Sequence, residues 1–226
     1  MTNDRIKAII FDAFGTVFDT MDASVRATAR ILHKNRSSLN PDVVYREWKA
    51  YHEQHIASLS EFVKEEDIYL MDLQRIYRNY GIDGNAEEDV RIMLATFSVR
   101  QSFPEASKTI NCLRDRYHVY IGSNSDSQPL RSVIELNKIA VDGCFSSELL
   151  QVYKPQREFF MRILKAIGRQ HHEAIYVGDS QIDDLLGASK AVIDTIWINR
   201  RSEHLTESIP KPLHEVKSLD EILSIL

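Results

Sequence analysis

Polar side chains follow several short apolar runs in this chain of 226 residues, and their types are suited to hydrolytic chemistry. The residues in question are Asp12, Ser123, Asn124, Lys154, Asp179, Asp183 and Asp184. Carboxylates, a lysine and a hydroxyl in one cleft could hold a cation and an anion together. One aspartate could then lie close enough to a bound substrate to attack it as a nucleophile.

The elements that must position these residues alternate between strand and helix. Apolar runs predict strands at 6–11, 119–122, 144–147, 174–177 and 195–199. Helices are predicted at 105–116, 129–136, 157–168 and 218–226, and ahead of the last strand. This alternation predicts an α/β fold with a doubly wound, mostly parallel sheet and helices on both faces. Ligands of such sheets bind beyond the carboxyl ends of the strands, where the polar residues fall.

A helical block interrupts the predicted sheet directly after its first strand. Helices are expected at 21–32, at 41–57, at 65–80 and at 86–99. Asn40 and Pro41 can supply an N-cap and a first helical proline, and Gly81 is placed as a terminator. The sequence therefore predicts a core domain of residues 1–19 and 101–226 and a four-helix insert of residues 20–100.

The composition is that of an ordinary globular protein with a mildly acidic balance. The chain is 43% hydrophobic, and its formal net charge of −5 argues against nucleic acid or an anionic membrane as the main partner. Cys112 and Cys144 make neither a disulfide framework nor a CxxC pair. The N-terminus shows no signal peptide, and no apolar stretch of about 20 residues occurs, so a cytoplasmic protein is expected. The sequence does not indicate an oligomeric state.

Four motifs in order resemble those of the haloacid dehalogenase superfamily, over nearly the whole chain. Residues 11–19 resemble the first motif, Ser123-Asn124 the second, Lys154-Pro155 the third and residues 178–188 the fourth. The helical insert resembles the cap that one branch carries after the first strand. The resemblance implies a modified Rossmann-like core and a hydrolase that acts on a small anionic substrate.

The resemblance also implies catalytic and substrate-binding roles. Asp12 would be the nucleophile that forms a covalent aspartyl intermediate, and Thr16 would hydrogen-bond near its carboxylate. Ser123 and the neighbouring backbone N–H groups would hold an anionic oxygen of the substrate, with Asn124 beside it. Lys154 would neutralise the charge around the nucleophile and the substrate.

A magnesium site is implied in the same cleft. Asp12 and Asp179 would bind Mg²⁺ together with the backbone carbonyl of Phe14, and hard oxygen ligands of this kind suit that ion. Asp184 would stand behind them and orient Lys154 or a metal-bound water.

The first motif favours the dehalogenase branch. Phosphatases of the superfamily carry a second aspartate two residues after the nucleophile, which protonates the leaving oxygen. Here that residue is Phe14, which would line the substrate pocket and can donate no proton. An aromatic residue there is typical of 2-haloacid dehalogenases, whose halide leaves as a stable anion.

The fourth motif favours the phosphatase branch. Dehalogenases have a serine where this chain has Asp179 and an asparagine where it has Gln181. They also carry a tyrosine six residues after the lysine, where this chain has Phe160. The arginine that their cap supplies could be replaced only by Arg46 or Lys49.

The sequence prediction is therefore a hydrolase acting through Asp12, with Mg²⁺-dependent hydrolysis of a small phosphomonoester as the first choice. A metal-independent (S)-2-haloacid dehalogenase is one alternative, and a catalytically impaired protein that binds a small anion or a partner is another. His52 and His55 could reach one side of their helix but are expected to pack or to face solvent. Arg200-Arg201 is expected to be a solvated turn.

Overall fold

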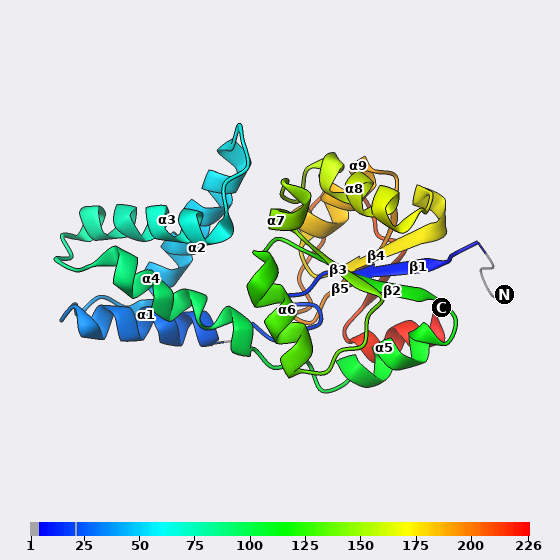
Figure 1. Cartoon of the computed structure of the whole chain (residues 1–226), viewed down its shortest axis with the longest axis horizontal. Helices are drawn as coiled ribbons and strands as arrows, with labels where there is room; N and C mark the ends of the chain where they lie inside the picture. The colour runs from blue at the N-terminus through cyan, green and yellow to red at the C-terminus, as the bar shows by residue number, and fades with distance from the viewer. Residues whose placement is uncertain (1–4, 21) are drawn as a thin grey trace. The chain divides into compact units, whose positions relative to one another are not determined.

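The computed structural model describes residues 5–20 and 22–226 (Figure 1). The chain divides into two compact units, one of Met1–Asp19 with Gln101–Leu226 and one of Thr20–Arg100. Met21, the predicted start of the first insert helix, lies outside the described residues.

A six-stranded sheet, parallel throughout, forms the centre of the larger unit, in the order β3-β2-β1-β4-β5-β6. Its strands are β1 (Ala8–Phe11), β2 (His118–Ser123), β3 (Gly143–Ser146), β4 (Ala174–Gly178), β5 (Asp194–Ile198) and β6 (His214–Val216). The first strand is central and the chain winds outward from it in both directions, which confirms the predicted doubly wound α/β fold. The carboxyl ends of β1, β2 and β4 therefore lie at one edge.

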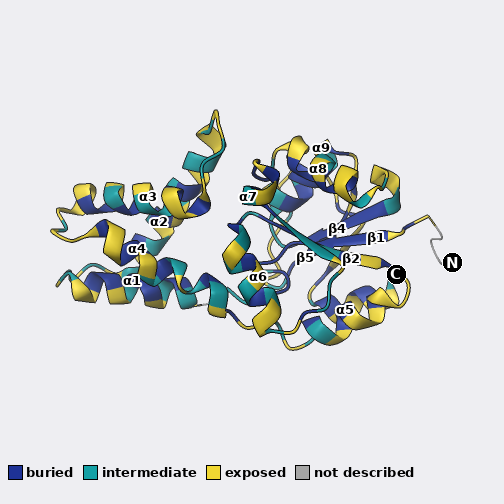
Figure 2. Ribbon diagram, in the orientation of Figure 1, coloured by how far each residue is buried: buried dark blue, intermediate teal, exposed yellow. Residues whose placement is uncertain are grey.

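Helices cover both faces of this sheet. They are α5 (Ala106–Arg114), α6 (Ser127–Leu136), α7 (Ser147–Leu150), α8 (Arg157–Ile167) and α9 (Gly187–Lys190), with the 3-10 helices η2 (His171–Glu173) and η4 (Leu219–Ser224) and the π-helix η3 (Gln181–Leu186). Successive residues of β1 point to opposite faces. Ile9 and Phe11 therefore pack with α5, α6 and η4, while Ala8 and Ile10 pack with α8 and α9. Figure 2 shows β1 and β4 buried along their length.

Two elements at the end of the chain differ from the sequence prediction. The strand β6 was not predicted because it is three residues long and only Val216 of it is buried. The closing helix predicted at 218–226 is a 3-10 helix confined to Leu219–Ser224. Its Leu219 and Ile222 are buried in the core, so the apolar spacing was interpreted correctly but the helix type was not.

The described residues of the smaller unit form four α-helices and a closing 3-10 turn. The helices are α1 (Ala23–Lys34), α2 (Pro41–Ser58), α3 (Glu65–Tyr80) and α4 (Ala86–Leu94), followed by η1 (Phe97–Val99). The Asn40 side chain accepts hydrogen bonds from Asp42 and Val43 N–H at the start of α2. Gly81 ends α3 with a φ of 64°, a left-handed conformation that glycine adopts readily. The helix predicted at 86–99 ends earlier, at Leu94.

A buried polar cluster joins α2 to α3 inside this unit. His52 is 8% exposed and lies 3.7 Å from a Glu65 oxygen and 3.6 Å from an Asp72 oxygen. The other oxygen of Asp72 lies 3.1 Å from His55 Nδ1, which is hydrogen-bonding distance. The ring of Tyr69 lies against His52, with their centroids 4.2 Å apart. The two histidines therefore share one side of α2, as their spacing suggested, and both face the carboxylate of Asp72.

Among the described residues, no helix has the length and apolar character needed to cross a lipid bilayer.

Candidate active site

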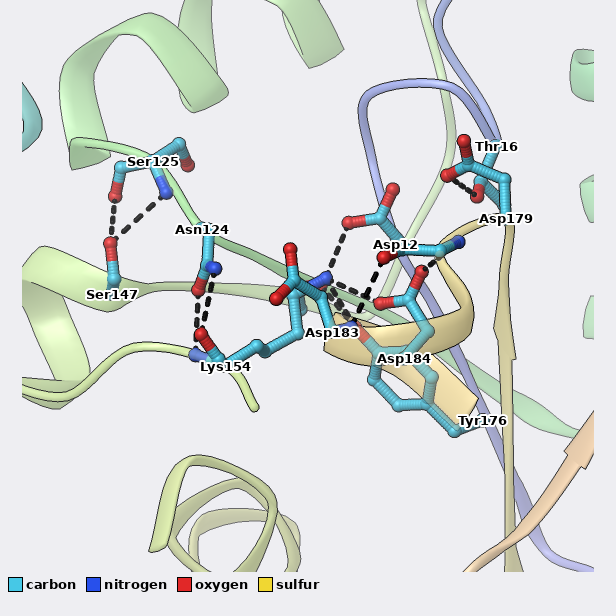
Figure 3. Close-up of polar contacts among 12 residues, drawn as sticks. Asp12, Thr16, Asn124, Ser125, Ser147, Lys154, Tyr176, Asp179, Asp183 and Asp184 are labelled. Carbon is cyan, nitrogen blue, oxygen red and sulfur yellow. Dashed lines mark hydrogen bonds and ion pairs between the residues drawn. The ribbon is translucent and has the colours of Figure 1, made fainter. Parts of the chain in front are cut away.

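The predicted site residues of the larger unit gather where β1, β2 and β4 end (Figure 3). Asp12 follows β1, and its backbone N–H donates to the Val177 carbonyl of β4 at 2.8 Å. Ser123 ends β2, and Asp179 follows β4 directly. Parallel strands bring their carboxyl ends to one edge, so residues far apart in the sequence become neighbours here.

Lys154 lies at the centre of the cluster and is 2% exposed. Its Nζ lies 2.7 Å from Asp12 Oδ1, 2.7 Å from Asp184 Oδ1 and 3.1 Å from the Tyr176 hydroxyl oxygen. The backbone of Lys154 is held by Asn124, whose Oδ1 accepts from Lys154 N–H and whose Nδ2 donates to its carbonyl. Asn124 was predicted to bind substrate; in the structure its amide binds the lysine segment.

Thr16 and Asp179 meet on the other side of Asp12. The Thr16 hydroxyl donates to Asp179 Oδ1 at 3.1 Å. The loop between β1 and Thr16 approaches so closely that a Cβ on Gly15 would lie 2.3 Å from Asp179 Oδ2. Gly15 also has a φ of 101°, a backbone conformation that other residues rarely adopt. Both the close contact with Asp179 and this conformation therefore require glycine at the turn. The Trp197 indole N–H donates to the Asp179 carbonyl at 3.0 Å and so holds the backbone of Asp179 in place.

Asp184 is buried and has both carboxylate oxygens engaged. Oδ1 contacts Lys154, and Oδ2 accepts from the Ser180 N–H at 2.9 Å. A Cβ on Gly178 would lie 2.3 Å from the Asp184 carboxyl carbon, so the strand end must be glycine for the carboxylate to reach the lysine.

Negative charge is in excess at the site. One oxygen each of Asp12, Asp179 and Asp184 lies within 4.8 Å of the others, and Lys154 faces two of these carboxylates. Burial raises the pKa of Asp12 to about 7, with Asp184 and Asp179 adding to the rise and Lys154 opposing it. Burial and the charge of Asp184 raise the pKa of Asp179 to about 6. Such a cluster favours either a bound cation or a proton.

The aromatic residue of the first motif is half-buried. The Phe14 ring packs on the apolar core and lies 6.1 Å, centroid to centroid, from the ring of Phe18. Ser123 is 1% exposed at the end of β2. Gln181 points away from the carboxylates, because its amide binds the His204 carbonyl and the Thr206 N–H.

Two residues near the site escaped the sequence analysis. Tyr176 lies in a strand run that was interpreted only as apolar core, but its hydroxyl reaches Lys154. Arg200-Arg201 forms the turn that was expected, and Arg201 is exposed, but the prediction of solvent exposure was wrong for Arg200. Its guanidinium lies 3.5 Å from the Phe103 ring centroid, pairs with Glu105 at 2.8 Å and donates to the Thr16 carbonyl at 3.1 Å. A charged residue shortly after a strand end was the available signal for Arg200, whereas Tyr176 lies in the middle of β4 and offered none.

Two residues considered as substitutes for the cap arginine lie on α2 of the smaller unit. Arg46 and Lys49 are both exposed, and Lys49 pairs with Glu53 at 3.6 Å.

The comparisons of this chain with known proteins identify the enzyme family to which it is similar. A model of haloacid dehalogenase-like hydrolases matches residues 6–191. The chain is 24% identical to (S)-2-haloacid dehalogenase 4A of Burkholderia cepacia, over 99% of this chain and 96% of the relative. It is 28% identical to glyceraldehyde 3-phosphate phosphatase of Pyrococcus furiosus, over 85% and 80%. A solved dehalogenase structure with an intermediate complex superposes with a TM-score of 0.83 at 21% identity, covering 99% of this chain and 98% of that one.

Proposed function

Because the chain belongs to the haloacid dehalogenase-like hydrolase family, we propose that it is a 2-haloacid dehalogenase that acts through Asp12. The substrate would be a small carboxylate with a halogen on the neighbouring carbon, of the (S) configuration. This is the alternative raised by the sequence, and the similarity to a 2-haloacid dehalogenase over nearly all of both chains supports it better than the first choice.

The observation that carries the proposal is that the residue two places after Asp12 is Phe14, an aromatic ring packed on the apolar core. A phosphate ester loses an alkoxide, which needs a proton as it leaves, and the half-buried Phe14 ring can supply none. A halide leaves as a stable anion and needs no acid. The site therefore suits displacement at carbon better than hydrolysis of an alkyl phosphate.

The residues support a two-step reaction. Lys154 holds Oδ1 of Asp12, so Oδ2 attacks the halogen-bearing carbon, a C–O bond forms, and the halide leaves with the C–halogen electron pair. Water then attacks the carboxyl carbon of the Asp12 ester. We assign the proton of that water to Asp179, because both oxygens of Asp184 already have partners. Asp179 then gives the proton to the alkoxide oxygen of the product, so that the 2-hydroxy acid departs and the Asp12 carboxylate is restored.

A second candidate is Mg²⁺-dependent hydrolysis of a phosphomonoester, and the carboxylate cluster favours it. Asp12, Asp179 and Asp184 offer hard oxygen ligands within 4.8 Å of one another, which fits Mg²⁺. When bound, the ion would offset the excess negative charge and attract a phosphate group. Asp12 and Asp179 would hold it, and Asp184 would orient Lys154. The similarity to glyceraldehyde 3-phosphate phosphatase supports this candidate.

The test is an assay of both substrate classes with and without Mg²⁺. Halide release from (S)-2-chloropropionate in the presence of EDTA supports the dehalogenase. Phosphate release that requires Mg²⁺, without halide release, supports the second candidate instead. Asp12→Asn should abolish either activity, whereas Asp115→Asn, the same change at an exposed position of this unit, should leave it unchanged. If neither substrate reacts and Asp12→Asn is equally folded, a protein that only binds a small anion or a partner becomes the better hypothesis.

A further inference from the structure

The Lys154 ammonium uses its full hydrogen-bonding capacity inside the protein. A protonated lysine has three N–H donors and no acceptor. Three oxygens surround Nζ, namely Asp12 Oδ1 at 2.7 Å, Asp184 Oδ1 at 2.7 Å and the Tyr176 hydroxyl at 3.1 Å. Two of these partners are carboxylates that belong to the site, and the third is a tyrosine that no motif marks.

The hydrogen bonds of Tyr176 have a fixed direction. Its side chain is fully buried on β4, and its hydroxyl donates to the Gly122 carbonyl at 2.6 Å. A phenol carries one proton, so the oxygen is left as an acceptor for Lys154. Gly122 directly precedes Ser123, the end of β2. The hydroxyl therefore connects the lysine to the strand end that carries the second motif.

We propose that Tyr176 is a positioning residue for the proposed reaction: it fixes the Lys154 ammonium so that Asp12 is held by Oδ1 and presents Oδ2 to the substrate. A lysine on a flexible four-carbon stem can rotate about its bonds unless all its donors are engaged. With the third donor held by Tyr176, the ammonium stays between Asp12 and Asp184 when substrate binds.

The ring of Tyr176 is held by its neighbours as well. The Phe160 ring meets it edge-on at 5.0 Å between centroids. The outer edge of Phe160 packs on Gly187, where an added Cβ would lie 2.8 Å from Phe160 Cζ. Packing of the ring therefore supports the hydrogen bonds that place the hydroxyl at Lys154.

The first test removes one oxygen atom. Tyr176→Phe keeps the ring and the packing but leaves one donor of Lys154 without its partner. We expect kcat to fall about 10-fold or more, the usual effect of a hydrogen bond to a charged group, while KM changes less than about twofold. Tyr117→Phe is the matched control, because it removes a buried tyrosine hydroxyl that donates to the Leu226 carbonyl at 3.0 Å. A kcat within twofold of wild type for Tyr176→Phe, or an equal loss in Tyr117→Phe, would overturn the proposal.

The second test observes the ammonium itself and does not depend on activity. In protein labelled with ¹⁵N at lysine, the Lys154 ammonium protons of the wild type should exchange slowly with water. The signal is assigned by its loss in Lys154→Met. Tyr176→Phe should speed this exchange and shift the resonance, and Tyr117→Phe should do neither. Fast exchange in the wild type would overturn the positioning role. If neither substrate class reacts, the proposed function fails, while this measurement still decides the role of Tyr176.

Discussion

At the scale of single residues, the site is governed by one buried cation among several carboxylates. Lys154 pairs with Asp12 and Asp184, and Asp179 stands near both without contacting the ammonium at salt-bridge distance in the described structure. A buried charge that loses its partner is costly, because desolvation is no longer repaid by attraction. The lysine therefore stabilises the fold as well as the nucleophile.

Lys154→Met should destabilise the protein by about 3 kcal/mol, since it leaves buried carboxylates facing one another. Urea unfolding at pH 8 measures this directly, and activity should be lost at the same time. Lys190→Met is the control, because Lys190 is exposed and its Nζ only donates to the Pro155 carbonyl. Equal stability of the two variants would contradict the conclusion that Lys154 stabilises the fold by pairing with buried carboxylates.

Asp179→Ser places at this position the residue that dehalogenases carry. If the substrate is a 2-haloacid, removing a negative charge near its carboxylate should lower KM about tenfold. Asp179→Asn should act in the same direction, because it removes the charge and keeps the shape. Steady-state kinetics with (S)-2-chloropropionate measure the effect. A KM that rises in both variants would mean that Asp179 helps to bind the substrate, through a cation.

The residues that form the carboxylate–lysine cluster could be predicted from the sequence, and their surroundings could not. Asp12 and Asp179 directly follow strands, and Lys154 lies in the loop region after β3 and α7, so their places along the chain predicted a common edge. Tyr176 carries no such signal, because an aromatic residue in an apolar strand is normally core. Arg200 was misjudged because an arginine after a strand is usually solvated, whereas here Phe103 and Glu105 cover it.

At the scale of secondary structure, the apolar patterns located the strands β1 to β5 and the long helices, and they missed the shortest strand, β6. Helix α3 was predicted with its observed bounds, since its terminating Gly81 and apolar stripe agree. Strand β6 offers three residues, too few for an alternation to be recognised, and it exists because it pairs with β5. Such short strands form because they pair with another strand in the folded protein, and the local sequence carries no information about that pairing.

The buried histidine of α2 should make the smaller unit sensitive to alkaline pH. Burial lowers the pKa of His52, but Asp72 and Glu65 together outweigh burial and raise the pKa from 6.5 to about 9. A raised histidine pKa contributes stability that is fully present below 6.5 and is lost as the pH rises through 9. The full contribution is at most about 3 kcal/mol.

Urea unfolding between pH 6 and pH 10 tests this linkage. The wild type should lose stability over that interval, and His52→Gln should lose much less, because glutamine does not titrate. His171→Gln, a change at an exposed histidine, should follow the wild-type curve. Parallel curves for the wild type and His52→Gln would show that folding does not raise the pKa of His52.

At the scale of the whole molecule, Mg²⁺ should raise thermal stability whether or not the reaction uses it. The three carboxylates near Lys154 would bind the ion only in the folded state. The gain is about 2.7 kcal/mol when the free ion is at 100 times its Kd. Melting curves with millimolar MgCl₂ and with EDTA measure it, and Asp179→Ala should show no difference between them. An unchanged melting temperature in the wild type would remove the support for the magnesium-dependent candidate.

The central position of β1 has a consequence for the order of events during synthesis. β1 leaves the ribosome before either of its neighbours, because Ala8 pairs with His118 of β2 and with Ala174 of β4. The helices of Thr20–Arg100 meet partners within their own segment and can close much sooner. Until β2 has been synthesised, the nascent chain would therefore carry a folded helical unit after an unpaired apolar strand. Such a strand is a target for chaperones and for aggregation until β2 and then β4 cover its two edges.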